Sequence, residues 1–300
     1  MKTINNLIRE TCNARKADKE IERNNRIEEI YTVYPQLERL DEGIIRVRGQ
    51  NLIRIAEKNL DISDLPTEEE KRLDAMRKDF IAKHCIDPAF DEEKVICSKC
   101  SDTGFIKKKY KDRYIYKVCG CMQSELEEAY EAAGLGDFSL ILPSAFDPEY
   151  IEVSEEKRIN VNRRLTKALT DYILDGNSDT YIYTDGVQTG KTFLSVCFAK
   201  VAIELGCSVM YMKIDNFGQL DLTEDKDKIN FLKDCDFLLI DDFASIITGN
   251  NRVAYLLNMI LEARQAKGLI SLVISNETKE MIVDSCDERI AGKLRSAVRL

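Results

Sequence analysis

The chain of 300 residues has no tryptophan, one histidine and five prolines. It also lacks any run of about eighteen apolar residues, so we expect no helix that spans a membrane. Its first residues, Met1 to Asn6, show no long apolar segment of the kind that marks a secretory signal. We therefore expect a cytoplasmic protein, in which cysteines stay reduced and disulfides are rare.

Acidic residues are in excess, with 53 aspartates and glutamates against 44 lysines and arginines and a net charge of −9. Non-specific affinity for nucleic acid comes from basic side chains that neutralise phosphates. The charge balance therefore excludes a general nucleic-acid coat, and any contact with DNA must be local. A chain of this length is enough for two domains with a sizeable core.

A turn of small and polar residues follows the apolar segment 181–184 and precedes a helical pattern. Backbone N–H groups at a helix start point at an anion, and the helix dipole favours negative charge there. Lys191 would reach the β- and γ-phosphates of a nucleotide, and the hydroxyl of Thr192 would hold Mg²⁺. The turn predicts a site for ATP and Mg²⁺, the alternative being an ordinary strand–turn–helix corner. The residues predicted to bind nucleotide here are Gly186, Thr189, Gly190, Lys191 and Thr192.

The apolar run 237–240 ends in two acids, Asp241 and Asp242. Such a run suits a strand buried on both faces of a parallel sheet. Acids at its carboxyl end lie where ligands bind in open α/β sheets. We predict that Asp241 binds Mg²⁺, directly or through water, and that Asp242 orients or polarises the attacking water. The alternative is a strand that ends in a solvated acidic turn.

A third apolar segment, 269–275, ends at Asn276, which is a candidate to contact the γ-phosphate or the water; the alternative is a simple turn residue. Helical patterns at 192–205 and 252–267 alternate with the predicted strands. This alternation predicts an α/β fold, a mostly parallel sheet with helices on both faces.

At this point the sequence resembles a known family. The motifs at 189–192, 238–242 and 274–276 are similar to those of AAA+ ATPases of the DnaC/DnaI helicase-loader type, and 287–290 fits the same pattern. The related IstB-type transposition ATPases share this core. The resemblance covers roughly residues 135–300 and implies an AAA+ P-loop ATPase. It implies Walker A roles for Lys191 and Thr192, Walker B roles for Asp241 and Asp242, and a sensor I role for Asn276.

The resemblance also implies an arginine finger near the C-terminal end of the sequence, which acts on ATP bound to a neighbouring subunit. Arg289 lies in the segment concerned; the alternative is a surface residue paired with an acidic neighbour. Lys293 stands in the stretch where the family often has arginine, and lysine lacks the planar fork of arginine. Arg289, Lys293 and Arg295 are therefore all candidates, and we expect a homo-oligomer when ATP is bound.

Two residues of the nucleotide turn depart from the family pattern. Asp185 and Gln188 stand where glycine is usual. A carboxylate near bound phosphates is unfavourable unless it points away or contacts the metal or the ribose. Gly186 lies one position later and is a candidate to supply the turn. These departures imply weak ATP binding or slow hydrolysis, which a nucleotide switch can tolerate.

The cysteines indicate a second module. Cys97 and Cys100 form one close pair, and Cys119 and Cys121 form another after a segment long enough for a β-hairpin. Two close pairs at this separation suit a tetrahedral four-cysteine Zn²⁺ site. The alternatives are free thiols or disulfides. Loaders of the DnaI kind carry a small zinc-binding N-terminal module, which this cluster resembles.

Six further cysteines are scattered, and Cys197 and Cys235 lie in apolar contexts typical of small core residues. The single histidine, His84, precedes the first cysteine pair, but four cysteines already suffice for zinc.

Between the pairs, residues 107–117 contain six basic residues and three tyrosines against one acid. Basic side chains contact phosphates and tyrosines stack on unpaired bases, so this segment is a candidate for a nucleic-acid contact. The alternatives are a solvated hairpin or a surface for an acidic protein.

Residues 1–90 show helical periodicity and many charges. Pro35 is expected to end a first helix, a second is expected over 41–59, and a capping box at Thr67 to Glu70 begins a third. We expect their apolar stripes to form a core. In the family resembled, this end of the chain contacts the replicative helicase.

The sequence thus predicts an AAA+ domain at 135–300, a zinc module with a following helix at 91–134, and a helical partner-binding region at 1–90. The function implied is an ATP-dependent loader of a replicative hexameric DNA helicase onto single-stranded DNA. An IstB-type transposition regulator is an alternative, against which the cysteine cluster argues mildly. A non-hydrolysing adaptor that binds nucleotide or DNA is another.

Overall fold

The computed structural model describes residues 2–58, 65–110, 112–146, 156–176, 179–187, 189–243 and 251–300, and these form two compact units. The sheet unit comprises Met1–Thr11 and Cys97–Leu300, and the helical unit comprises Cys12–Ile96. Within the described ranges, no helix is both long and apolar enough to cross a membrane.

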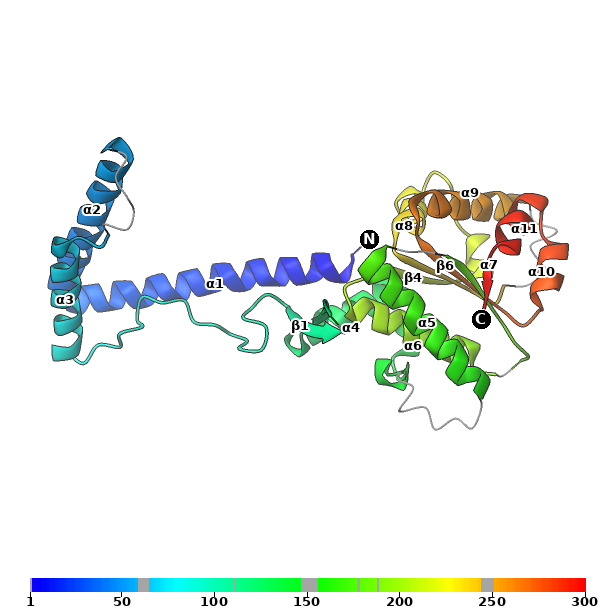
Figure 1. The fold of residues 1–300 in the computed structure, drawn as a ribbon, viewed down its shortest axis with the longest axis horizontal. Helices are drawn as coiled ribbons and strands as arrows, with labels where there is room; N and C mark the ends of the chain where they lie inside the picture. Colours follow the sequence, from blue (N-terminus) through cyan, green and yellow to red (C-terminus); the bar gives the residue numbers. More distant parts are fainter. Residues whose placement is uncertain are drawn as a thin grey trace. The chain divides into compact units, whose positions relative to one another are not determined.

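A five-stranded parallel sheet is the centre of the sheet unit (Figure 1). Its strands lie in the order β4-β5-β6-β3-β7, so the chain moves from β3 to an edge and returns past it. The carboxyl ends of β3, β5 and β6 therefore meet at one edge of the sheet. The strands are β3 (Thr180–Thr184), β4 (Val209–Lys213), β5 (Phe237–Asp241), β6 (Ile270–Ser275) and β7 (Val298–Arg299).

Helices cover both faces of this sheet, as predicted (Figure 1). On one face, α6 (Lys191–Glu204) lies on β4 and β5, and α4 (Gln123–Ala132) and α5 (Glu156–Asp175) pack against α6. On the other face, alternate strand residues such as Leu238 and Ile240 share a core with α8 and α9. The helices of this face are α7 (Ile214–Phe217), α8 (Lys226–Asp234), α9 (Asn251–Lys267) and α11 (Glu288–Arg295), with α10 (Lys279–Ser285) beside α11.

Helix α6 is enclosed on nearly all sides. Phe198 and Cys197 are fully buried, and even Lys200 is 3% exposed, its ammonium donating to the carbonyls of Phe138 and Ile141. A helix that is apolar all round is a buried helix. Because α6 cannot shift without disturbing its neighbours, its first residues are held at a fixed place above the sheet.

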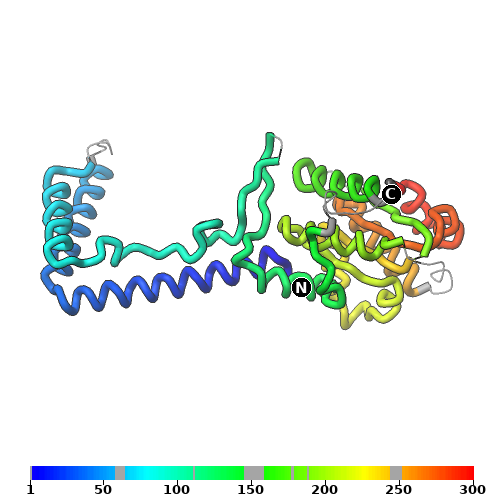
Figure 2. Tube along the Cα trace, turned by 90° about the horizontal axis from the view of Figure 1, so that it is seen from below, coloured from blue at the N-terminus to red at the C-terminus, as the bar shows by residue number. Residues whose placement is uncertain are grey.

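The cysteine pairs bracket a hairpin, as predicted. Strands β1 (Phe105–Tyr110) and β2 (Arg113–Val118) are antiparallel, with Phe105 opposite Val118 and Tyr110 opposite Arg113; Figure 2 shows them as two adjacent extended runs. The first turns of α1 (Ile4–Val33) belong to the same unit, where Thr11 donates to Glu125 on α4 at 2.7 Å.

The helical unit contains the rest of α1 together with α2 (Pro35–Lys58) and α3 (Glu68–Lys83). The first helix ends at Val33, before Pro35, and Thr67 caps α3 with the predicted capping box. A small core of Leu37, Ile81, Ile86 and Phe90 joins the three helices.

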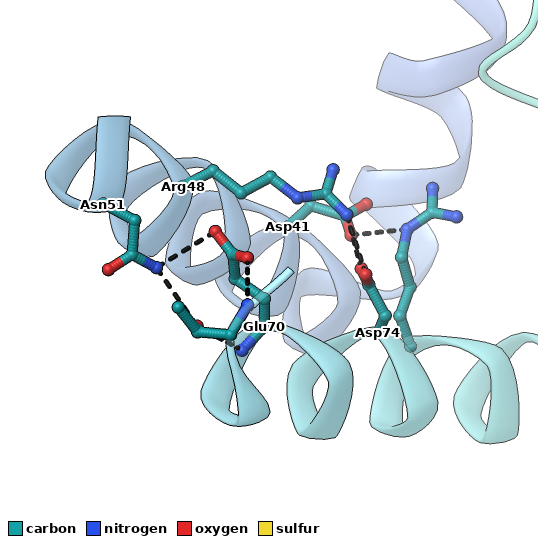
Figure 3. Close-up of polar contacts among 7 residues, drawn as sticks. Asp41, Arg48, Asn51, Glu70 and Asp74 are labelled. Atoms are coloured by element: carbon teal, nitrogen blue, oxygen red, sulfur yellow. Dashed lines mark hydrogen bonds and ion pairs between the residues drawn. The ribbon is translucent and has the colours of Figure 1, made fainter. Parts of the chain in front are cut away.

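Polar contacts join α2 to α3 along one side of α2 (Figure 3). Arg48 donates to both carboxylate oxygens of Asp74 at 2.8 Å. Asn51 donates to Glu70 at 3.0 Å, and further along Arg77 donates to Asp41 at 2.7 Å. These interactions direct the polar side of α2 toward α3.

The apolar side of α2 is core only in part: Ile44 is buried, as expected, whereas three other apolar residues of the helix are exposed, contrary to expectation. Ile45 is 72% exposed, and Leu52 and Ile53 are 56% and 58% exposed. Their spacing of seven and eight residues brings them onto one side of the helix, next to the side that faces α3. We call Ile45, Leu52 and Ile53 the α2 stripe.

Gly134 follows α4 with a φ of +79°, and a Cβ there would lie 2.5 Å from the backbone oxygen of Tyr211. Gly176 also has a positive φ, of +68°, but a Cβ there would have no atom within 4 Å. An alanine at this position would therefore be destabilised by the left-handed backbone alone, without a steric clash.

We expect Gly176→Ala to lower the free energy of unfolding by about 1 kcal/mol. Gly134→Ala should lower it by at least about 2 kcal/mol more than Gly176→Ala does, because its Cβ would also clash. Urea unfolding followed by circular dichroism measures both, and equal losses would contradict the close approach.

Candidate functional site

The nucleotide turn lies between β3 and α6. Gly190, with a φ of +80°, directly precedes α6, and Lys191 is its first residue. The side chain of Lys191 is buried, and its ammonium donates to the carbonyl oxygens of Asp185 at 2.9 Å and Gly186 at 2.6 Å, with Thr189 Oγ1 at 3.3 Å. The turn therefore folds around the lysine, whose charge lies beside the amino end of a buried helix.

Asp185 has its carboxylate engaged within the same turn. Its Oδ1 accepts a hydrogen bond from the backbone N–H of Gly186 at 2.8 Å. This contact is a local one of the kind that aspartate makes in turns. Gln188, the other departure from the family pattern, lies outside the described residues.

The carboxylate of Asp241 is buried at the end of β5 and accepts three hydrogen bonds. Its Oδ2 accepts from Thr192 Oγ1 at 2.8 Å and from the hydroxyl of Tyr211 at 2.7 Å, and its Oδ1 accepts from Asp242 N at 2.8 Å. Burial raises the pKa of Tyr211, and the bond to Asp241 adds to this effect, so the phenol stays a donor. Thr192 and Asp241 are thus in direct contact, and their sharing of a metal ion stays a prediction.

Asp242 adopts a left-handed backbone with a φ of +54°, which is uncommon outside glycine. Its half-exposed carboxylate pairs with Lys213, at the end of β4, at 2.9 Å. This hydrogen bond raises the pKa of Lys213. Strained backbone of this kind costs roughly 1–3 kcal/mol and tends to occur at functional sites.

A cleft of about 300 Å³ lies at this edge of the sheet. Asn276 is exposed at its rim after β6, and Ser275 donates its hydroxyl to the carbonyl of Phe243. The cleft therefore brings together most of the predicted nucleotide and catalytic residues, although their roles stay predictions. Its lining residues are Val187, Thr189, Gly190, Lys191, Thr192, Asp241, Asp242, Ser275 and Asn276.

The three basic candidates for the arginine finger lie on α11, and none lines the cleft. Arg295 pairs with Glu288 at 2.6 Å, and Lys293 donates to Asn258 at 2.7 Å. Arg289 is exposed, and among the described residues its guanidinium has no hydrogen-bond or ion-pair partner. An arginine finger that acts on ATP in a neighbouring subunit needs an exposed guanidinium that is not paired within its own chain.

Tyr211, Lys213 and Ser275 were not predicted from the sequence. Tyr211 and Lys213 approach the acids because β4 pairs with β5 in a register that places Lys213 beside Asp241. The available signal was the apolar pattern of the β4 segment, which can be assigned to this edge only once the strand order is known.

The four predicted cysteines converge at the base of the hairpin. Cys97 and Cys119 have their Sγ atoms 3.8 Å apart, those of Cys100 and Cys121 are 3.6 Å apart, and all four lie within 4.8 Å of one another. A tetrahedral zinc with Zn–S bonds of about 2.3 Å needs sulfur separations of about 3.8 Å. Disulfide sulfurs lie about 2.05 Å apart, so no cysteine of this cluster is bridged. The cluster fits a zinc module.

The loop around the first cysteine pair favours the thiolate form of Cys97. Backbone N–H groups of Cys100 and Lys99 lower the pKa of Cys97 to about 6, which favours the thiolate that binds metals. Ser101 and Asp102 both have positive φ, and the Asp102 carboxylate accepts from Cys97 N at 2.7 Å. His84 takes no part and packs on Phe80 in the helical unit.

No family profile and no curated protein matches this chain. Several solved structures are similar to it. The DnaI structure is 16% identical with a TM-score of 0.46, over 51% of this chain and 88% of that one. The DnaC helicase loader is 15% identical with a TM-score of 0.45, over 55% and 97%. The AMPPCP-bound DnaA of Aquifex aeolicus is 22% identical with a TM-score of 0.44, over 52% and 49%, so the chain spans about half of that protein.

All three TM-scores are below 0.5, so these similarities decide neither the family nor the function of this chain. The five-stranded parallel sheet, the turn after β3 and the acidic pair after β5 agree with the α/β fold that the motifs predict. A function for the chain must be argued from its own residues.

We expect the purified chain to hold about one Zn²⁺, and Cys121→Ser to lower its zinc affinity at least about ten-fold because a thiolate ligand is lost. Cobalt substitution would give the absorption bands of a tetrahedral thiolate site. Cys85→Ser is the control, because Cys85 is exposed and outside the cluster. Zinc binding that survives Cys121→Ser unchanged would show that the cluster is not the ligand set.

Proposed function

We propose that the chain is an ATP-dependent helicase loader, which binds a replicative hexameric DNA helicase in the cytoplasm and delivers it to single-stranded DNA. The observation that carries this proposal is the presence in one chain of a cleft lined by Lys191, Thr192 and two acids and of a helical unit with an exposed apolar stripe. The cleft would supply a nucleotide-driven switch, and the stripe a surface for a protein partner.

The residues of the cleft fit ATP and Mg²⁺ by their chemistry. The Thr192 hydroxyl and the Asp241 carboxylate offer adjacent oxygen donors, which Mg²⁺ prefers. Lys191 and the N–H groups at the start of α6 would hold the phosphates. When bound, Mg²⁺ neutralises charge on the phosphates, while Asp242 and Asn276 would orient the attacking water.

Arg289 completes the proposal at the level of assembly. Its exposed guanidinium would reach ATP bound to a neighbouring copy, so that the ATP-bound form is a homo-oligomer. Lys293 and Arg295 already have partners within their own chain, and Arg289 is therefore the preferred finger.

The α2 stripe suits a helix of a protein partner. Full burial of one such side chain contributes about 1.5–3 kcal/mol, and three lie together on one side of α2. The polar contacts to α3 hold α2 in place without using the stripe. The helicase is thus proposed to bind the helical unit.

A non-hydrolysing adaptor is a second candidate, favoured by the ion pair between Asp242 and Lys213. A carboxylate held by an ammonium is less able to accept a proton from water. Hydrolysis separates the two candidates.

We expect slow ATP hydrolysis that single-stranded DNA stimulates. Lys191→Ala should abolish both nucleotide binding and hydrolysis, since the phosphates lose their cation. Asp242→Asn should keep binding but lower turnover at least about 100-fold, because the water is no longer activated. Steady-state phosphate release and fluorescent nucleotide binding measure the two effects. Turnover that is absent from the wild type, with binding intact, would favour the adaptor.

For the partner, we expect the chain to co-purify with the replicative helicase of its own source. Ile45→Glu should weaken this association at least about ten-fold, because apolar burial is lost and a charge must be desolvated. Ile21→Glu is the matched control, as Ile21 is 58% exposed and belongs to α1, whereas the stripe belongs to α2. If both variants bind the helicase like the wild type, the stripe is not the docking surface.

A further inference from the structure

The hairpin has two chemically different faces. Directly opposed residues of an antiparallel pair lie on the same face, so Lys107 joins Tyr116 and Lys109 joins Tyr114. Lys108, opposite Ile115, and Lys117, opposite Ile106, lie on the other face. We call Lys107, Lys109, Tyr114 and Tyr116 the tyrosine face.

The opposite side of the hairpin is occupied by contacts within the sheet unit. Lys117 pairs with Glu204 of α6 at 2.9 Å, and Arg113 pairs with Asp175 at the end of α5 at 2.6 Å. At the base, Cys119 N donates to the carbonyl of Gly104 at 2.8 Å, beside the cysteine cluster. The hairpin is therefore held at both ends, and the tyrosine face is left toward solvent.

The side chains of the tyrosine face are exposed and basic. Tyr114 is 53% and Tyr116 is 55% exposed, and both lysines are exposed. The ammonium of Lys107 lies 4.0 Å from the centroid of the Tyr114 ring, so cation and ring form one surface. The two strands contain no acidic residue. In a chain with a net charge of −9, this is a local basic surface with aromatic rings.

A groove of about 560 Å³ runs along the base of this face. Lys107, Tyr116 and Phe105 line one side, and Gly206, after α6, lines the other. A groove with a lysine and a tyrosine on one wall matches the two parts of a nucleotide, because the phosphate takes the cation and the base takes the ring.

We propose that the tyrosine face binds single-stranded DNA. Tyr114 and Tyr116 are two residues apart on the same face of β2, which separates them by about 7 Å. Each ring would therefore stack on a separate base. Lys107 and Lys109 would contact the phosphates between them. A duplex fits less well, because its bases are already stacked on each other. This proposal rests on the proposed loader function in one respect: that function is the reason for choosing single-stranded DNA and not RNA as the ligand.

The test is the affinity of the full chain for a fluorescein-labelled oligo(dT), measured by anisotropy across a salt series. Tyr114→Ala with Tyr116→Ala should weaken binding by about ten-fold or more, because stacking is lost. Lys107→Gln with Lys109→Gln should weaken binding and reduce the log–log salt slope by about 1.4, since two phosphate contacts disappear. The tyrosine changes should leave the slope as it is.

Matched controls lie on the same strands. Lys108→Gln removes one charge from the neighbouring position on the opposite face and should leave affinity and slope unchanged. Tyr116→Phe keeps the ring and should keep the affinity. The zinc content of each variant reports whether the hairpin is folded.

Affinity that is equal in the wild type and in both double variants would overturn the inference, as would binding of a duplex in preference to the single strand. Double variants that keep oligo(dT) affinity but lose the helicase would assign the face to a protein and overturn it too. Loss of oligo(dT) binding in a chain that never binds the helicase would uphold the inference while the loader function fails.

Discussion

The buried carboxylate of Asp241 is the constraint on which the site depends. A charge removed from water must be hydrogen-bonded, and its donors come from the first turn of α6, from β4 and from the residue that follows β5. Satisfying this one group therefore fixes three segments against each other. The same geometry places Lys191 and the amino end of α6 beside two acids, an arrangement that suits a phosphate-bound cation.

Much of the sheet unit could be predicted, because strongly apolar strands and helices alternate there and the motifs fall at their ends. Thr192, Asp241 and Asn276 meet because parallel strands share a carboxyl edge, which follows from the sequence pattern alone. Tyr211 and Lys213 could not be assigned to the site in this way. Their positions depend on β4 pairing with β5, and strand order is a tertiary property that periodicity does not contain.

The helical unit shows a different limit. Periodicity correctly located the end of α1 and the cap at Thr67, since these are local properties, but it began the second helix at residue 41, whereas α2 begins at Pro35. It assigned Ile45 and Leu52 to a core, however, because an apolar stripe normally marks the covered face. Here the polar contacts of Arg48 and Asn51 join α2 to α3 beside a small apolar core, and Ile45 and Leu52 remain exposed. The buried face of a helix is determined by the elements that pack against it. The sequence of that helix alone does not contain this information.

The division of the chain also has a topological meaning. The helical unit is an insertion, because the polypeptide leaves the sheet unit after Thr11 and re-enters it at Cys97. The two units are thus connected by two covalent crossings, one within the continuous helix α1 and one that arrives directly at a cysteine of the cluster. An insertion attached at both ends stays joined to the sheet unit when one of its two connections is cut, whereas a domain on a single linker would be released.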